Sequence, residues 1–151
     1  MPTYRTGNMW DESHNAYDPP QIFLATTNNV IVGDSLVMGA GSAFEMTQRF
    51  YQAERKFAAA IRQTKNPKRY LLVCTGKYGI IQTKYHYRDP SPLELVADSL
   101  SRLSRLAELF PTTTIHCPFP GIGLGGLREA IVKPYLDGLV QADNVHIWTY
   151  Q

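Results

Sequence analysis

The chain has 151 residues, 44% of them apolar, which is enough for one globular domain with a layered core but not for two full domains. The formal charge of +2 is too small to indicate a dedicated nucleic-acid surface, although residues 65–69 form a local basic patch. No run approaches the roughly 18 apolar residues of a spanning helix, and the N-terminus lacks the apolar core of a signal peptide. We therefore expect a single soluble, cytoplasmic domain over residues 1–151, with Cys74 and Cys117 as free buried thiols.

The N-terminal third predicts two strands and one helix. Residues 1–20 are polar and aromatic, and only the neighbours of Tyr4 suggest a short strand. After Gln21, the run IFLATTNNVIV is apolar and β-branched, which indicates a central strand entering a loop. Ser42 and Glu45 then form an S-x-x-E capping box, so a helix should begin at Ser42 and end near residues 66–67. Its buried face is expected at Ala43, Phe50, Phe57 and Ile61, with Thr47 on the same stripe.

The rest of the chain alternates strands and helices. Residues 70–74 and 80–83 are β-prone runs around a glycine-containing turn, which predicts an antiparallel hairpin. Ser91 opens a second capping box with proline at the first helical position, and strands follow at 113–117 and 145–149. Between these strands lies a helix that Pro134 must shorten or kink. In the helix after Ser91, the expected buried face is Leu93, Val96, Leu100, Leu103 and Ala107. In the helix that contains Pro134, it is Leu127, Ile131 and Tyr135. This order predicts an α/β fold with a mixed sheet.

Two glycine-rich stretches, residues 38–43 and 120–127, occupy the same place in this order, between the end of a strand and the start of a helix. Glycine lets the backbone approach a ligand, and the free amides of a helix start favour anions. Two such loops in one domain suggest a ligand with more than one phosphate, held by amides rather than by lysines. The alternative is that the glycines only form tight turns. The predicted contact residues are Met38, Gly39, Ala40, Gly41 and Ser42 in the first loop and Gly121, Ile122, Gly123, Leu124, Gly125 and Gly126 in the second.

The second loop also matches the spacing G-x-G-x-x-G of a Rossmann-type dinucleotide fingerprint. Its position disfavours that interpretation, because the fingerprint needs a following strand that ends in an acidic ribose-binding residue. The paired-loop interpretation therefore remains the stronger one.

Three blocks of the sequence, from about residue 21 onward, resemble the macro domain family: ATTNNVIVGDSLVMGAGSA, GIIQTKYHYRDPSPLELVADSL and PFPGIGLGGLREAIVKPYL. The first is similar to the ribose- and phosphate-binding segment of that family, the second to its central strand and helix, and the third to its second phosphate loop. The resemblance implies a three-layer α/β/α fold with ADP-ribose in a crevice at the edge of the sheet. Asn28 matches the asparagine that precedes the first phosphate loop.

Within the family, the chain looks similar to the branch that removes ADP-ribose from glutamate side chains or DNA bases. In that branch a lysine after the central strand attacks or positions the anomeric carbon, and Lys84 occupies the matching place. A lysine can act there as a nucleophile through its neutral amine, or stabilise negative charge as a cation. The alternative is a solvated lysine at a strand end.

Two positions depart from the family pattern. Some members of the branch carry an aspartate in the second loop, where this chain has Gly125. Asn8 stands where the family commonly has the aspartate that accepts a hydrogen bond from the adenine amino group, and its amide oxygen is a weaker acceptor than a carboxylate. The DNA-directed antitoxin members share the threonine-lysine pair and the Gly-Leu-Gly-Gly loop.

Three functions stay open. The first is a module that binds free or protein-linked ADP-ribose without chemistry. The second is a hydrolase that acts on ADP-ribosylated DNA or protein through Lys84, or a phosphatase that acts on ADP-ribose 1″-phosphate. The third is a non-catalytic domain that binds a different nucleotide or signalling ligand. We expect no cofactor, metal or membrane partner, and we expect structural roles for His86, His116, His146 and Asp34.

Overall fold

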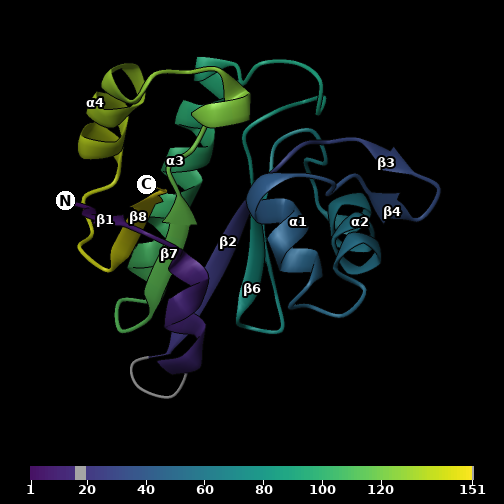
Figure 1. Cartoon of the computed structure of the whole chain (residues 1–151), viewed down its shortest axis with the longest axis horizontal. Coiled ribbons are helices and arrows are strands. Elements are labelled where there is room, and N and C mark those ends of the chain that lie inside the picture. The colour runs from purple at the N-terminus through teal and green to yellow at the C-terminus, as the bar shows by residue number, and fades with distance from the viewer. Residues whose placement is uncertain (16–19, 151) are drawn as a thin grey trace.

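The apolar strand β2 (Gln21–Thr27) lies at the centre of a six-stranded sheet, as its buried, β-branched sequence predicts. A computed structural model describes residues 1–15 and 20–150 of the chain, so the last part of the polar segment before β2 lies outside the described residues. The sheet has the order β1-β8-β7-β2-β6-β5, and every neighbouring pair except β5 with β6 is parallel (Figure 1). Its other strands are β1 (Thr3–Thr6), β5 (Leu71–Cys74), β6 (Tyr78–Gln82), β7 (Thr114–Pro118) and β8 (Val145–Thr149).

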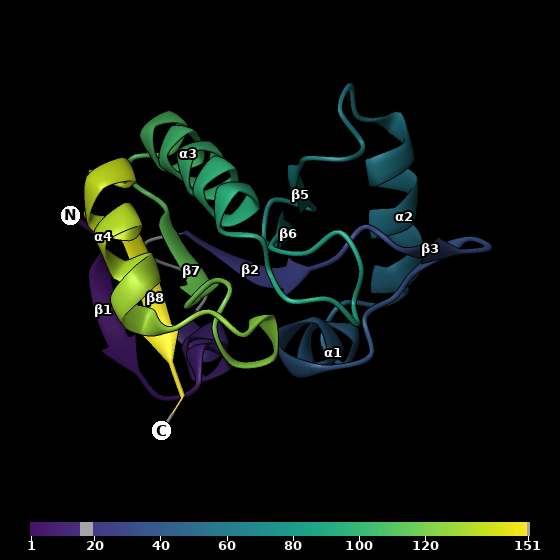
Figure 2. The ribbon, with the colours of Figure 1, turned by 90° about the horizontal axis from the view of Figure 1, so that it is seen from above.

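Helices cover both faces of the sheet, because alternate side chains of β2 point to opposite sides. Phe23 and Ala25 pack with α1 (Gly41–Thr47), α2 (Ala53–Gln63) and the 3-10 helix η1 (Met9–Asn15). Ile22 and Leu24 pack with α3 (Leu93–Leu109) and α4 (Glu129–Leu139) on the other side. Figure 2 shows the sheet edge-on between these layers. The predicted three-layer α/β/α fold with a mixed sheet is confirmed.

The β strands follow the sequence expectations closely. The strand around Tyr4, the antiparallel β5–β6 hairpin and the last strand all form. A separate two-stranded hairpin, β3 (Ile31–Val32) and β4 (Ser35–Leu36), lies between β2 and α1. Sequence reasoning missed this hairpin and also η1, which buries Met9 and Trp10.

The helix predicted from Ser42 is in fact two helices, and its capping box is wrong. The chain breaks between α1 and α2, where Gln52 adopts a left-handed backbone conformation with φ of 57°. Helix α1 begins at Gly41 with Ala40 at its N-cap and no side-chain cap. Ser42 is therefore already inside the helix, and its hydroxyl accepts a hydrogen bond from the Thr26 amide at 3.1 Å instead. The four apolar residues of the predicted face are buried, whereas Thr47 is only half-buried.

The capping box predicted at Ser91 is also wrong. Helix α3 begins at Leu93, so Pro92 is the N-cap and no side chain caps the helix. Four residues of the predicted buried stripe are buried, but Leu93 is only half-buried. Leu95, which was not predicted, is fully buried.

The face predicted for the last helix is wrong by one position. Helix α4 begins at Glu129, after Leu127, and runs past Pro134 to Leu139. Ile131 and Tyr135 are exposed, and the buried residues are Val132 and Leu136. Both stripes have the same i, i+4 spacing, so only the contact with α3 decides which one is covered.

Both cysteines are free; Cys117 is buried, whereas Cys74 is only half-buried. Burial raises the pKa of the Cys117 thiol to about 12, and it raises the pKa of Cys74 as well. Among the described residues, no helix has both the length and the apolar character needed to cross a membrane.

Candidate functional site

The two glycine-rich loops follow β2 and β7, which are neighbours in the sheet. The connection after β2 leads to α1 on one face, and the connection after β7 leads to α4 on the other. Adjacent parallel strands whose connections leave on opposite faces open a crevice at their carboxyl ends, which is the common ligand position in open α/β sheets. The fold therefore brings the two loops to the same place.

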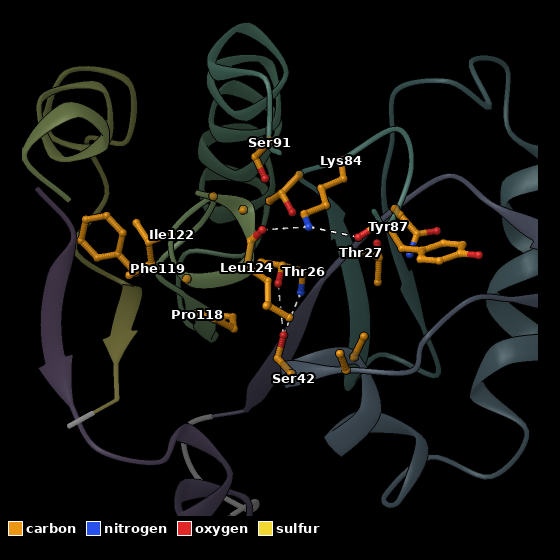
Figure 3. A pocket seen from close by; sticks show the side chains of 18 of the residues that line it. Thr26, Thr27, Ser42, Lys84, Tyr87, Ser91, Pro118, Phe119, Ile122 and Leu124 are labelled. Atoms are coloured by element: carbon orange, nitrogen blue, oxygen red, sulfur yellow. Dashed lines mark hydrogen bonds between the residues drawn. The ribbon is translucent and has the colours of Figure 1, made fainter. Parts of the chain in front are cut away.

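A cavity of about 730 Å³ lies in this crevice. Its walls come from the carboxyl ends of four parallel strands and from both loops: residues 26–28, 83–84, 118–119, 148–150, 37–43 and 121–125, together with Tyr87, Ser91 and Glu129. Such a volume is typical of small-molecule sites. Figure 3 shows side chains from both loops, from β2 and β7 and from the segment after β6 around it.

Most of the residues that the sequence pointed to line this cavity. Asn28, Lys84, the predicted first-loop residues from Met38 to Ser42 and the second-loop residues from Gly121 to Gly125 all do so. Gly126 does not line it, and its amide donates to the Gly123 carbonyl at 3.0 Å. Asn8 does not line it either. Its side-chain oxygen accepts a hydrogen bond from the Trp10 amide at 3.0 Å at the start of η1.

The first loop offers unused backbone donors. The amides of residues 39–43 donate to no backbone acceptor among the described residues, because they lie in the loop or in the first turn of α1. Gly41 has φ of 58°, a conformation that glycine adopts at little cost. The bonds from the Thr26 amide and hydroxyl to the Ser42 hydroxyl tie the loop to the end of β2.

The second loop is a glycine turn and not a helix start. It contains the single 3-10 turn η2 (Gly123–Gly125), and residues 126–128 separate η2 from α4. This corrects the expectation that a helix begins directly behind it. Gly121 and Gly123 have φ of 80° and 64°, and the amides of residues 121–124 donate to no backbone acceptor among the described residues. The loop therefore presents turn amides to the cavity.

Lys84 bridges two walls of the cavity. Its ammonium donates hydrogen bonds to the carbonyls of Leu124 at 3.0 Å and Tyr87 at 3.3 Å, which joins the segment after β6 to the second loop (Figure 3). The amide of Lys84 donates to the Thr27 carbonyl at 3.3 Å. No carboxylate of the described residues forms a salt bridge with this ammonium. Lys84 thus supplies a positive charge that an anionic ligand can pair with.

Asn28 is buried, and both the nitrogen and the oxygen of its side-chain amide form hydrogen bonds. Its nitrogen donates to the Val37 carbonyl at 2.9 Å, and its oxygen accepts from the Val30 amide at 2.8 Å. The buried Tyr70 hydroxyl donates to the Asn28 carbonyl and hydrogen-bonds the Thr27 hydroxyl at 2.7 Å. One of the two hydrogens on the Asn28 side-chain nitrogen remains available to a ligand.

The opposite end of the cavity is aromatic, with Phe119, Trp148 and Tyr150 in its walls. The indole nitrogen of Trp148 donates to Nδ1 of His116 at 3.0 Å, so Nε2 of this imidazole carries the proton that it shares with the Gln21 side-chain oxygen. Burial, and then the charges of His146 and Arg5, lower the pKa of His116 to about 3. Sequence reasoning missed these aromatic residues, although each follows or ends a predicted strand.

The remaining candidates lie outside the cavity. His116 and His146 are sheet residues in β7 and β8, as expected. His86 lies in the turn after β6, where its Nδ1 accepts from the Arg88 amide at 3.1 Å. Asp34 is exposed and lies within 3.9 Å of Arg55 and 3.7 Å of Arg62. No cluster of metal-binding side chains occurs in the part of the chain that the structure describes.

No known family profile matches the chain, and no curated protein does. Several solved structures are similar to the chain. The macrodomain of Thermus aquaticus DarG has a TM-score of 0.69 and 26% identity, over all of this chain and 98% of that one. The macrodomain of Mycobacterium tuberculosis DarG has a TM-score of 0.64 and 25% identity, over 98% and 97% of the two chains. Thermosipho africanus DarTG in complex with ADP-ribose has a TM-score of 0.63 and 20% identity, over 85% of this chain and 38% of that chain.

The fold and the cavity define a three-layer α/β/α domain with a ligand-sized crevice at the carboxyl edge of its sheet. Its likeness over nearly the whole chain to solved macrodomains then identifies it more closely. The chain has the macro domain fold, and it is similar over nearly its whole length to the two DarG macrodomains.

Proposed function

We propose that this macro domain binds ADP-ribose, or a molecule that contains it, with the diphosphate between the two glycine-rich loops. One observation carries the proposal: both loops line a single cavity and both have backbone amides that donate to no backbone acceptor among the described residues. Such amides bind phosphate oxygens without the flexibility of lysine side chains. The related Thermosipho africanus structure, solved in complex with ADP-ribose, supports the same ligand.

The two ends of the cavity suggest the orientation of the ligand. Phe119, Trp148 and Tyr150 offer apolar rings for the adenine base. The amide of Gly7 donates to the Thr149 carbonyl at 2.9 Å, so Asn8 lies beside this end without lining it. The terminal ribose then lies at the other end, near Asn28 and Lys84.

Replacing a glycine of the second loop tests the diphosphate site. A Cβ at Gly123 would meet nothing within 4 Å, but its φ of 64° strains a β-branched residue. Gly123→Val should therefore weaken ADP-ribose binding about tenfold or more in calorimetry, because the loop must give up its conformation. Gly138→Ala in α4, also in open space, is the matched control and should bind as the wild type does. Absence of wild-type binding at millimolar ADP-ribose would remove the proposal.

We further propose that the domain hydrolyses ADP-ribosyl adducts, with Lys84 acting at the anomeric carbon of the terminal ribose. The supporting observation is the Lys84 ammonium in the cavity wall, held by two carbonyls and without a described carboxylate partner. As an amine it can attack the carbon while the departing carboxylate or base takes the bonding electron pair and a proton; water then breaks the lysine–ribose bond, releases ADP-ribose and restores the amine. As a cation it can instead stabilise the leaving group while water attacks the carbon. Gly125 supplies no carboxylate at the position where some members of the branch carry an aspartate.

Turnover of ADP-ribosylated DNA, ADP-ribosylated protein and ADP-ribose 1″-phosphate tests this second proposal. Lys84→Ala should lower turnover of the active substrate at least about a hundredfold. Lys65→Ala, an exposed lysine outside the cavity, serves as control. If wild type and Lys84→Ala turn over equally, Lys84 is not catalytic. If the wild type processes none of the three substrates, the domain is a binding module.

A further inference from the structure

Ser91 carries a buried hydroxyl that forms no hydrogen bond to any described residue. Its side chain lines the cavity and the residue is only 4% exposed. A buried hydroxyl without a partner costs about 1–3 kcal/mol, and native proteins rarely leave one unsatisfied. The cavity is the place from which a partner can come.

The backbone holds Ser91 against the second loop. Pro92 restricts the backbone conformation of Ser91, which precedes it. The Ser91 amide donates to the Gly125 carbonyl at 2.8 Å. The position of Ser91 beside the loop is therefore built into the fold.

Gly125 leaves the space that the hydroxyl occupies. A Cβ at position 125 would lie 2.6 Å from Oγ of Ser91 and 3.3 Å from its Cβ. Any side chain at position 125 would therefore displace Ser91 or the loop. This contact gives a structural reason for the glycine in the second loop.

Ser91 lies against the second loop, and the Leu124 carbonyl of the same loop accepts a hydrogen bond from Lys84 (Figure 3). In the proposed binding mode, on which this inference rests, the loop amides take the phosphates and the sugar end lies near Lys84. A hydroxyl both donates and accepts, which suits a sugar hydroxyl. We propose that Ser91 is a specificity-determining residue whose hydroxyl hydrogen-bonds an oxygen of the ligand's terminal ribose.

Calorimetry of Ser91→Ala with ADP-ribose and with ADP, which lacks the terminal ribose, tests this inference. Ser91→Ala should bind ADP-ribose about fivefold more weakly or worse, and should bind ADP within about twofold of the wild type. Gly125→Ala should also lower the affinity for ADP-ribose, because its Cβ displaces the Ser91 hydroxyl or the loop. Ser101→Ala, on the surface of α3 outside the cavity, is the control and should bind both ligands normally.

A thermal melt separates recognition from a structural role. Since Ser91 has no partner to lose, Ser91→Ala should melt at or above the wild-type temperature. Unchanged ADP-ribose affinity in Ser91→Ala, or an equal loss for ADP and ADP-ribose, overturns the inference alone. A wild type that fails to bind ADP-ribose removes the proposed function first.

Discussion

The imidazole of His116 supports one wall of the cavity through its hydrogen bond to Trp148. It stacks on Phe23 with ring centroids 4.7 Å apart and is almost completely buried. In this setting the ring is neutral, because a proton on Nδ1 would remove the acceptor of the Trp148 indole. A histidine that the sequence presents only as a sheet residue thus holds an aromatic side chain of the site.

This histidine makes stability depend on pH. Its pKa is about 3 in the folded protein, against 6.5 ordinarily, so the unfolded chain binds a proton that the folded one excludes. The contribution is fully present above pH 6.5 and is lost as the pH falls toward 3, by up to about 1.4 kcal/mol per pH unit. Urea unfolding between pH 7.5 and 4.5 should show this slope.

His116→Asn keeps a polar group beside Trp148 but cannot titrate, so its slope should be shallower than that of the wild type. Parallel slopes for wild type and His116→Asn would show that His116 does not cause the dependence. The lowered pKa of His146, which is due mainly to burial, leaves a smaller residual slope in either case.

At the scale of elements, the site depends on close packing between β2 and its neighbours. Strand β6 lies between β2 and β5 and carries Lys84 just beyond its end. A Cβ at Gly79 in β6 would lie 2.6 Å from Cδ2 of Leu24 and 2.7 Å from the Leu72 carbonyl oxygen. Since the second of these atoms is backbone in the paired strand, the sheet itself would have to move.

Gly79→Ala should therefore destabilise the protein by about 1–3 kcal/mol or more, the usual cost of overpacking a core. Gly138→Ala in α4, where a Cβ meets nothing within 4 Å, should be neutral or slightly stabilising. Chemical denaturation of both variants measures the difference. Equal stability of the two would mean that β5 and β6 separate at little cost.

For the whole molecule, the cavity joins segments that lie far apart in the sequence. The loop after β2 and the loop after β7 meet because β7 pairs with β2 through the register Gln21 with Thr114. A ligand that contacts both loops holds the two halves of the sheet together. Binding and global stability should then be linked.

ADP-ribose should accordingly raise the melting temperature in a concentration-dependent way. At 100 times its dissociation constant, the free energy of unfolding should rise by about 2.7 kcal/mol. Gly123→Val should need a correspondingly higher concentration for the same shift. Thermal melts at a series of ADP-ribose concentrations check this. If the melting temperatures of wild type and Gly123→Val rise equally at each concentration, the ligand binds elsewhere.

The sequence by itself determined the features that depend on neighbouring residues. The strands follow from β-branched apolar runs, the fold class from their alternation with helices, and the two loops from glycines that can adopt positive φ. The predicted loop residues from Met38 to Ser42 and from Gly121 to Gly125, together with Asn28 and Lys84, line one cavity, because they follow strands that end at the same edge of the sheet.

Only the tertiary structure decided how individual side chains are used. Ser42 and Ser91 both match a capping box, yet the Ser42 hydroxyl bonds to the Thr26 backbone, and the buried Ser91 hydroxyl has no hydrogen-bond partner among the described residues. Contact with α3 determines which face of α4 is buried. The pairing of β7 with β8 brings His116 and Trp148 close together. Local patterns define which bonds a residue can make. The partner it takes depends on distant segments that the fold brings within reach. The hydroxyl of Ser91 was therefore visible in the sequence, but its burial beside the cavity without a hydrogen-bond partner among the described residues was not.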